Sequence, residues 1–336
     1  MAIYSEFDLP HVPGSHPDWQ ESFVLIFRDP MTGLVGFLRT GSYVNQGTTQ
    51  THWGMALPDG TRFRRHILDR KLEPGDRTET SASSGTLKYS LPGMEYCRFE
   101  AFDTDAEADL RIHDWFPSQE WAAVGGDHHG LLLAGGAEHG HPESAGRVEG
   151  RVRLGDRIFD IENGIGYRDH GYGPRPLPMF RSARWHAGTV GERLSYSLVS
   201  MHAENGEFSK FGWLMRDGKR EPIRDLHTVN CTLADGFSSI GGWTVVELES
   251  GEKIRIDVEA IDGVVTSTNL NNGGPDSSPA GIEVLSVPTW NGLTGVADFN
   301  MIDNPHRGKQ EVSHLFLANC DDGLSHRVFD PAWLRR

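Results

Sequence analysis

The chain has 336 residues, of which 40 are glycine and 37% are hydrophobic, and 47 acidic against 32 basic residues give a formal net charge of -15. This acidity opposes binding to nucleic acid or to an anionic membrane surface, and no apolar run reaches the ~18 residues of a membrane span. The glycine content also disfavours a helix-rich fold, because each interior glycine costs a helix about 1 kcal/mol.

From the N-terminus onward, the dominant pattern is a series of short runs with alternating apolar and polar residues, separated by tight turns. Turn pairs such as Gly155-Asp156 and Asp217-Gly218 tolerate the positive φ angles of hairpin turns. We expect strands over residues 23–27, 34–38, 53–56, 63–67, 151–154, 157–161, 213–215, 243–248 and 253–258. The best helical candidate, residues 105–109, is too short to matter. The sequence therefore predicts an all-β fold, either two barrels or one large β-sandwich.

The three cysteines, Cys97, Cys231 and Cys320, are odd in number and widely spaced. This pattern indicates neither a disulfide framework nor a cysteine zinc site, and it is typical of reduced thiols. The first residues contain no basic start followed by an apolar stretch. We therefore expect no signal peptide and a cytoplasmic protein.

The densest group of chemically active side chains lies in residues 164–175, GIGYRDHGYGPR. In an extended segment Tyr167 and Asp169 point to one face, and Arg168 and His170 point to the other. One face could therefore carry an acid beside a phenol, while the other supplies a cation. The same residues could instead form a structural ion pair at a polar strand end.

This run resembles the G-x-R/Y-x-D-H-x-W-G-x-R signature of the double-calycin family, which has two lipocalin-like barrels in one chain. The family includes carotenoid 1,2-hydratase, kievitone hydratase and fungal lipocalin-like Diels–Alderases, and the sequence is most similar to its uncharacterised bacterial members. Residues 19–36, 141–150 and 212–218 resemble further segments of those members. Tyr172 replaces the usual Trp of the family, and Pro142 replaces a frequent Tyr, so the substrate need not be that of a known relative.

The resemblance implies an all-β chain of two lipocalin-like antiparallel barrels in tandem. We expect a first barrel over residues 1–178, which includes the signature, and a second over residues 179–336, with the division near Pro178. The resemblance also implies a cofactor-independent acid–base enzyme that hydrates or dehydrates a C=C bond of an apolar isoprenoid, polyketide or aromatic molecule. The alternatives are an isomerase or cyclase on the same substrate class, and a non-catalytic lipocalin-like carrier.

The resemblance also suggests which side chains are catalytic. Tyr167 and Asp169 match the Tyr-x-Asp pair that has been proposed to protonate an alkene in carotenoid hydratases. Asp169 is therefore the expected general acid, with a pKa raised by burial, and Tyr167 would relay or position the proton. Glu143 is the expected second carboxylate, which would hold a water or take a proton back. His170 would orient the acid and tune its charge.

Five side chains are expected to contribute to substrate binding: Arg168, Tyr172, Arg175, Trp185 and His186. Arg168 would also help to orient the acid, and Tyr172 would form part of the wall of the pocket. Trp185 and His186 follow the signature closely enough to face the same pocket. Aromatic faces there would stabilise a carbocation, although a single tryptophan is ordinarily part of the core.

A second cluster contains His128, His129, His139 and His141. His139, His141 and Glu143 alternate on one strand face, which is compatible with metal ligation, but their spacing fits the cupin pattern poorly. We interpret the cluster as a histidine-rich loop and expect no metal. The sequence also lacks a phosphate-binding loop, a dinucleotide fingerprint and a nucleophile elbow, so we expect no cofactor. The expected partner is an apolar small molecule, and the sequence leaves open whether the chain forms a homo-oligomer.

Overall fold

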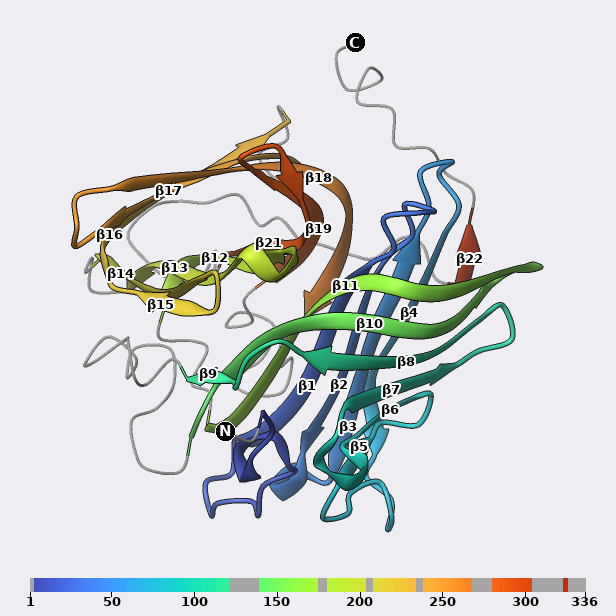
Figure 1. Ribbon diagram of the computed structural model, residues 1–336. Coiled ribbons are helices and arrows are strands. Elements are labelled where there is room, and N and C mark those ends of the chain that lie inside the picture. The colour runs from blue at the N-terminus through green and yellow to red at the C-terminus, as the bar shows by residue number, and fades with distance from the viewer. Residues whose placement is uncertain are drawn as a thin grey trace.

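The computed structural model describes residues 3–120, 139–174, 180–203, 208–233, 238–267, 280–303 and 323–325. These residues form two large antiparallel sheets, each curled toward a barrel, so the expected tandem lipocalin-like fold is confirmed (Figure 1). Helical structure among them is limited to short 3₁₀ turns at Glu6–Asp8, Val44–Gln46, Pro92–Met94 and Gly191–Arg193. The described part of the chain contains no helix with the length and apolar character needed to cross a membrane.

The first sheet is built mainly from the N-terminal half of the chain and has twelve strands. They are β1 (Trp19–Arg28), β2 (Val35–Tyr43), β3 (Thr48–Ala56), β4 (Arg62–Lys71), β5 (Ser81–Ser83), β6 (Leu87–Ser90), β7 (Cys97–Phe102), β8 (Ala106–Asp114), β9 (Gln119–Glu120), β10 (Pro142–Leu154), β11 (Arg157–Pro174) and β22 (Gly323–Ser325). Strand β22, from near the C-terminus, lies beside β4 at the edge of this sheet (Figure 1).

The second sheet has ten strands and follows directly in sequence. They are β12 (Phe180–Val190), β13 (Leu194–Ala203), β14 (Phe208–Arg216), β15 (Lys219–Glu221), β16 (Ile223–Thr232), β17 (Ser239–Leu248), β18 (Lys253–Ser267), β19 (Ala280–Trp290), β20 (Leu293–Thr294) and β21 (Val296–Asp303). Pro178 lies outside the described residues, and the division of the chain near it stays a prediction.

The hairpins expected from turn chemistry are present. Leu154 pairs with Arg157 across Gly155-Asp156, and Gly155 adopts the positive φ of 59° that favours glycine. Arg216 pairs with Lys219 in the same way across Asp217-Gly218. Residues 105–109 contribute to β8 instead of a helix, because every second residue of β8 is buried inside the first barrel.

Apolar side chains form three main clusters. One fills the first barrel and includes Phe23, Leu25 and Trp53, and another fills the second and includes Leu198 and Val246. The third lies between the two sheets. We call this layer the junction, and its members include Val24, Ile26, Val35, Phe37, Ala145, Tyr167, Ala187, Val199, Met201, Trp213 and Leu285.

Candidate active site

Strand β11 carries the signature and separates two environments. It pairs with β1 on one side and β10 on the other, and every described signature residue from Tyr167 to Tyr172 is buried. Tyr167 belongs to the junction, whereas Arg168 pairs with Asp114 inside the first barrel. The alternation of faces expected from the sequence is therefore present.

On the junction side, the register of β10 against β11 places Glu143 directly opposite Asp169. His141 lies between these two carboxylates, with Nε2 3.1 Å from Asp169 Oδ2 and Nδ1 3.4 Å from Glu143 Oε1. Gly140 and Tyr172 exchange two backbone hydrogen bonds of 3.0 Å. A Cβ at Gly140 would lie 2.5 Å from the Tyr172 ring, so glycine permits the close approach that brings His141 beside β11.

The pKa values in the group formed by His141, Glu143 and Asp169 depend on burial and on the charges within the group. Burial opposes the charged imidazolium, but the Asp169 and Glu143 carboxylates outweigh it and raise the pKa of His141 to about 9. Burial raises the pKa of Glu143, against the hydrogen bond from His141, and the Asp169 charge adds to the increase. His141 therefore carries a proton at neutral pH, held between the carboxylates of Asp169 and Glu143, and the raised pKa of Glu143 makes it the stronger base for a proton.

The second sheet completes the site with aromatic and polar side chains. Trp213 Nε1 donates a 2.8 Å hydrogen bond to Glu143 Oε2, and its ring lies parallel to that of Tyr167 at 6.2 Å. The ring of Trp185 is perpendicular to that of His141, with centroids 6.1 Å apart, and its Nε1 donates to Ser197 Oγ at 2.9 Å. Burial, followed by the charge on Glu143, raises the pKa of Tyr167 well above its usual value, so the phenol stays protonated.

A further carboxyl group from β21 contributes to the same electrostatic environment. Asp298 is fully buried and its Oδ1 accepts a 2.8 Å hydrogen bond from the backbone of Val284. Burial, the charge on Glu283 and the charge on Asp169 raise its pKa well above the usual value. The junction thus concentrates acidic groups from both sheets.

On the barrel side, Arg168 is held by acids. Its guanidinium donates to Asp114 Oδ2 at 2.5 and 2.8 Å, to Asp8 Oδ1 at 2.7 Å and to Ser118 Oγ at 2.9 Å. Although burial opposes its charge, Asp114 and Asp8 raise the pKa of Arg168 well above its usual value. These bonds tie the N-terminal segment and β8 to the back of the signature strand.

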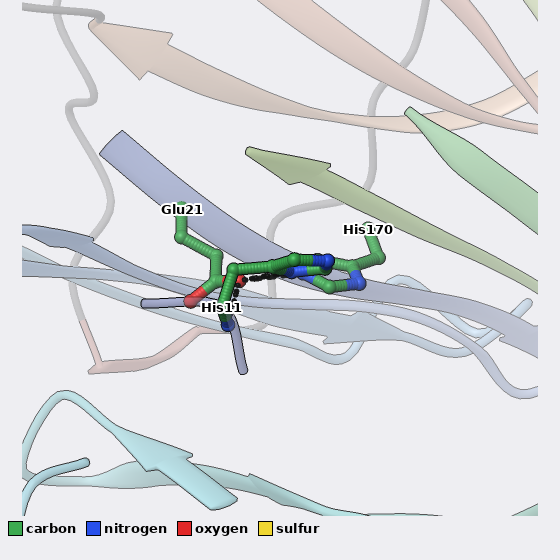
Figure 2. Close-up of side chains that lie close together, drawn as sticks. All are labelled: His11, Glu21 and His170. Atoms are coloured by element: carbon green, nitrogen blue, oxygen red, sulfur yellow. Dashed lines mark hydrogen bonds and ion pairs between the residues drawn. The ribbon is translucent and has the colours of Figure 1, made fainter. Parts of the chain in front are cut away.

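His170 belongs to a neighbouring cluster on the same side. Its Nδ1 donates to the Phe7 carbonyl at 2.8 Å, while its Nε2 lies 2.9 Å from Glu21 Oε1. Figure 2 shows His170 and His11 converging on the Glu21 carboxylate. The other oxygen of Glu21 is 2.5 Å from Arg77 Nη2. Glu21 therefore connects His11, His170 and Arg77 in one network of hydrogen bonds and ion pairs inside the first barrel.

The remaining expected site residues divide between these environments. Tyr172 stacks on His11 at 3.6 Å, on the barrel side of β11. Trp185 faces the junction, but the next residue, His186, points into the second barrel, where Tyr196 and Thr244 each hydrogen-bond it at 2.8 Å. Arg175, His128 and His129 lie outside the described residues. Asp169, Tyr167, Glu143 and Trp185 are thus brought together, whereas Arg168, His170, Tyr172 and His186 are not.

Among the residues that the structure describes, two groups of side chains have the donor types of a metal site. They are His11, Glu21 and His170, and His141, Glu143 and Asp169, and within each group the candidate ligand atoms lie within 4.8 Å of one another. Both sets mix imidazole nitrogen with carboxylate oxygen, as zinc accepts. The absence of a functional metal stays a prediction.

Sequence reasoning did not assign His141 or Trp213 to the acid–base site. The alternation of His141 and Glu143 in the sequence was a usable signal, since the two side chains, one just before β10 and one within it, point to the same side. No comparable signal links Trp213 to Glu143, because the two residues come from different sheets and lie 70 positions apart.

Several solved structures resemble the chain in fold. A protein assigned as an AttH (NE1406) from Nitrosomonas europaea is 12% identical, with a TM-score of 0.61 over 87% of this chain and 94% of that one. CghA bound to Sch210972 is 11% identical, with a TM-score of 0.59 over 90% and 96%. Kievitone hydratase from Nectria haematococca is 8% identical, with a TM-score of 0.55 over 85% and 88%.

These likenesses confirm the double-calycin fold that the signature suggested. No curated protein sequence matches the chain. A family model does match it, over residues 4–305 and thus across both sheets. The chain therefore belongs to the family described as Domain of unknown function (DUF7064).

Proposed function

We propose that the chain is an acid–base enzyme that adds water to, or removes it from, a C=C bond of an apolar small molecule bound at the junction. The observation that carries this proposal is the buried His141 held between Asp169 and Glu143. The arrangement supplies what hydration of an alkene requires, a proton donor for carbon and a separate base for water.

In the hydration direction, the Asp169 carboxylate receives the proton of His141 Nε2 across their 3.1 Å contact and delivers it to one alkene carbon. Water then adds to the other carbon, and Glu143 accepts the proton that the water loses. This proton returns to His141 Nδ1 across the 3.4 Å contact with Glu143, so the site is restored after each turnover. Dehydration follows the reverse path. The parallel rings of Tyr167 and Trp213 offer π faces that stabilise the intervening carbocation.

The surroundings favour an apolar substrate. The groups that carry the proton are embedded in a layer of apolar and aromatic side chains from both sheets, including Phe37, Met201 and Leu285. A structure of the same fold is named a hydratase, and another holds the small molecule Sch210972. Both names agree with chemistry on a small organic molecule.

The same carboxylates could also move a double bond or close a ring, since Glu143 can remove a proton from carbon while Asp169 delivers one. This is the second candidate, and a carrier without turnover is the third. Incubation in D2O with panels of isoprenoid, polyketide and aromatic alkenes, followed by mass spectrometry, separates the three. Hydration adds the elements of D2O, isomerisation adds deuterium without water, and a carrier does neither. The proposal predicts the first result, and binding without any deuterium incorporation would contradict it.

The pH dependence of the rate is expected to follow His141. Because its pKa is raised from 6.5 to about 9, the proton donor is present at neutral pH and is lost as the pH rises through about 9. The rate should be level from pH 6.5 to 8 and fall about tenfold per pH unit above 9. A wild-type rate that stays constant to pH 10 would contradict the role of His141.

The same ionisation contributes to stability. A raised imidazole pKa stabilises the fold fully below 6.5, and this contribution is lost as the pH rises through about 9. Urea unfolding of the wild type should therefore show a fall in stability over that window, and His141→Asn should remove this component.

A further inference from the structure

The junction face of the first sheet carries a second polar group, two strands away from Asp169. Four paired residues form one row across neighbouring strands. Asp169 on β11 lies opposite Val24 on β1, Val24 lies opposite Arg39 on β2, and Arg39 lies opposite His52 on β3. Gln50 lies in the adjacent row, opposite Gly41. Since neighbouring strands are about 4.8 Å apart, the backbone positions of Asp169 and Arg39 are about 10 Å apart.

Arg39, Gln50 and His52 are buried, yet each has one polar atom that makes no hydrogen bond. Arg39 and Gln50 are each 7% exposed and His52 is fully buried. Arg39 Nη1, Gln50 Oε1 and His52 Nε2 have no hydrogen-bond partner. Among the residues that the structure describes, no carboxylate pairs with Arg39, in contrast to the paired Arg168 on the other side of the sheet.

A buried charge without a partner is costly. A buried guanidinium without a counter-charge and a buried polar atom without a hydrogen bond both lose the interactions that water would otherwise provide. Unsatisfied buried groups of this kind are rare in folded proteins, and a bound ligand can complete them. Gly41 lets the guanidinium lie close against β2, because a Cβ at this position would crowd Arg39 Nη1 at 3.2 Å.

His52 supplies a neutral group beside the cation. Burial, together with the charges of Arg39 and His66, lowers the pKa of His52 well below its usual value, so the ring is uncharged at neutral pH. Its Nδ1 faces His66 Nδ1 at 3.1 Å, which leaves Nε2 for another partner. A cation, an amide and a neutral imidazole therefore lie together on one buried face.

We propose that Arg39, Gln50 and His52 form a head-group subsite, which binds a carboxylate at one end of an apolar substrate. The apolar part of the substrate then passes over Val24 toward Asp169. Arg39 pairs with the carboxylate, His52 donates a hydrogen bond to it from Nε2, and Gln50 donates from its amide nitrogen when that amide is turned over. The location of the reacting bond near Asp169 rests on the proposed function, whereas the binding of the carboxylate can be measured independently.

The test compares sodium decanoate with decan-1-ol, which has the same chain length and no charge, by isothermal titration calorimetry at pH 7.5. We expect the wild type to bind decanoate about 10- to 100-fold more tightly than decan-1-ol, the range typical of hydrogen bonds to a charged group. Arg39→Met should abolish this preference. Arg98→Met, which removes an arginine paired with Asp109 outside the junction, should retain it.

Thermal unfolding separates a binding role from a structural one. Arg39→Met replaces an unpaired buried charge by an apolar side chain of similar length, so its Tm should equal or exceed that of the wild type. Equal affinities of the wild type for decanoate and decan-1-ol, a preference that survives in Arg39→Met, or a lowered Tm of Arg39→Met would each overturn the inference.

Asp169→Asn keeps the two proposals distinguishable, because this variant should lose turnover and keep its preference for decanoate. Hydration of an uncharged alkene by a protein without that preference would support the proposed function and overturn the subsite. A preference for decanoate that depends on Arg39, in a protein that turns over no alkene, would do the reverse.

Discussion

Asp169→Asn is expected to lower the rate of water addition by about 10²- to 10⁴-fold, the range that a positioned acid typically contributes. Asparagine has nearly the same shape as aspartate but cannot transfer a proton. It also removes the nearer of the two negative charges that hold the proton on His141, with an oxygen 3.1 Å from Nε2. The residual rate should therefore decline at a lower pH than that of the wild type, because the pKa of His141 falls.

The matched control for this variant lies on the same strand. Asp160 is in β11 but its side chain is 65% exposed and pairs with Arg151, so Asp160→Asn should leave both the rate and its pH profile unchanged. Rates are measured by deuterium incorporation from pH 6 to 10, with and without EDTA. Full activity in Asp169→Asn, or loss of wild-type activity in EDTA, would contradict the proton-transfer mechanism.

The fold could be predicted because its signals are local. A Gly-Asp or Asp-Gly pair between two alternating runs fixes a hairpin without reference to the rest of the chain, as Gly155-Asp156 and Asp217-Gly218 show. The period of two in β11 likewise determines that Tyr167 and Asp169 share a face. Local sequence patterns do not show which layer this face contacts. The sequence alone was therefore compatible with one β-sandwich as well as with two barrels.

The partners of the site residues could not be predicted in the same way, because they depend on pairings between distant segments. Arg168 was expected to orient the acid, but it binds Asp8 and Asp114, which precede it by 160 and 54 positions. His141 contacts Asp169 only because β10 and β11 pair in one particular register, and a shift by one residue would turn it to the opposite face. The sequence could therefore name Asp169 as the candidate acid, but it could not show that His141 lies 3.1 Å from it.

Arg168→Met is expected to give the largest loss of stability of any signature variant, about 3–5 kcal/mol, because it leaves Asp8 and Asp114 buried without their cation. For a chain of this size such a loss lowers the Tm by roughly 4–7 °C. The N-terminal segment should also become sensitive to proteolysis, since it would lose the bond from Asp8 to Arg168. Urea unfolding and limited proteolysis measure the two effects.

Two further variants decide whether the loss of stability comes from unpaired buried charge. Arg151→Met removes an exposed partner of Asp160 and should change the stability by less than about 0.5 kcal/mol. Combining Arg168→Met with Asp8→Asn and Asp114→Asn should recover much of the loss, since the uncompensated carboxylates are then absent. If Arg168→Met were as stable as the wild type but inactive, Arg168 would belong to the catalytic machinery. The expected outcome instead assigns the two faces of β11 separate tasks, with proton transfer on the junction side and closure of the first barrel on the other.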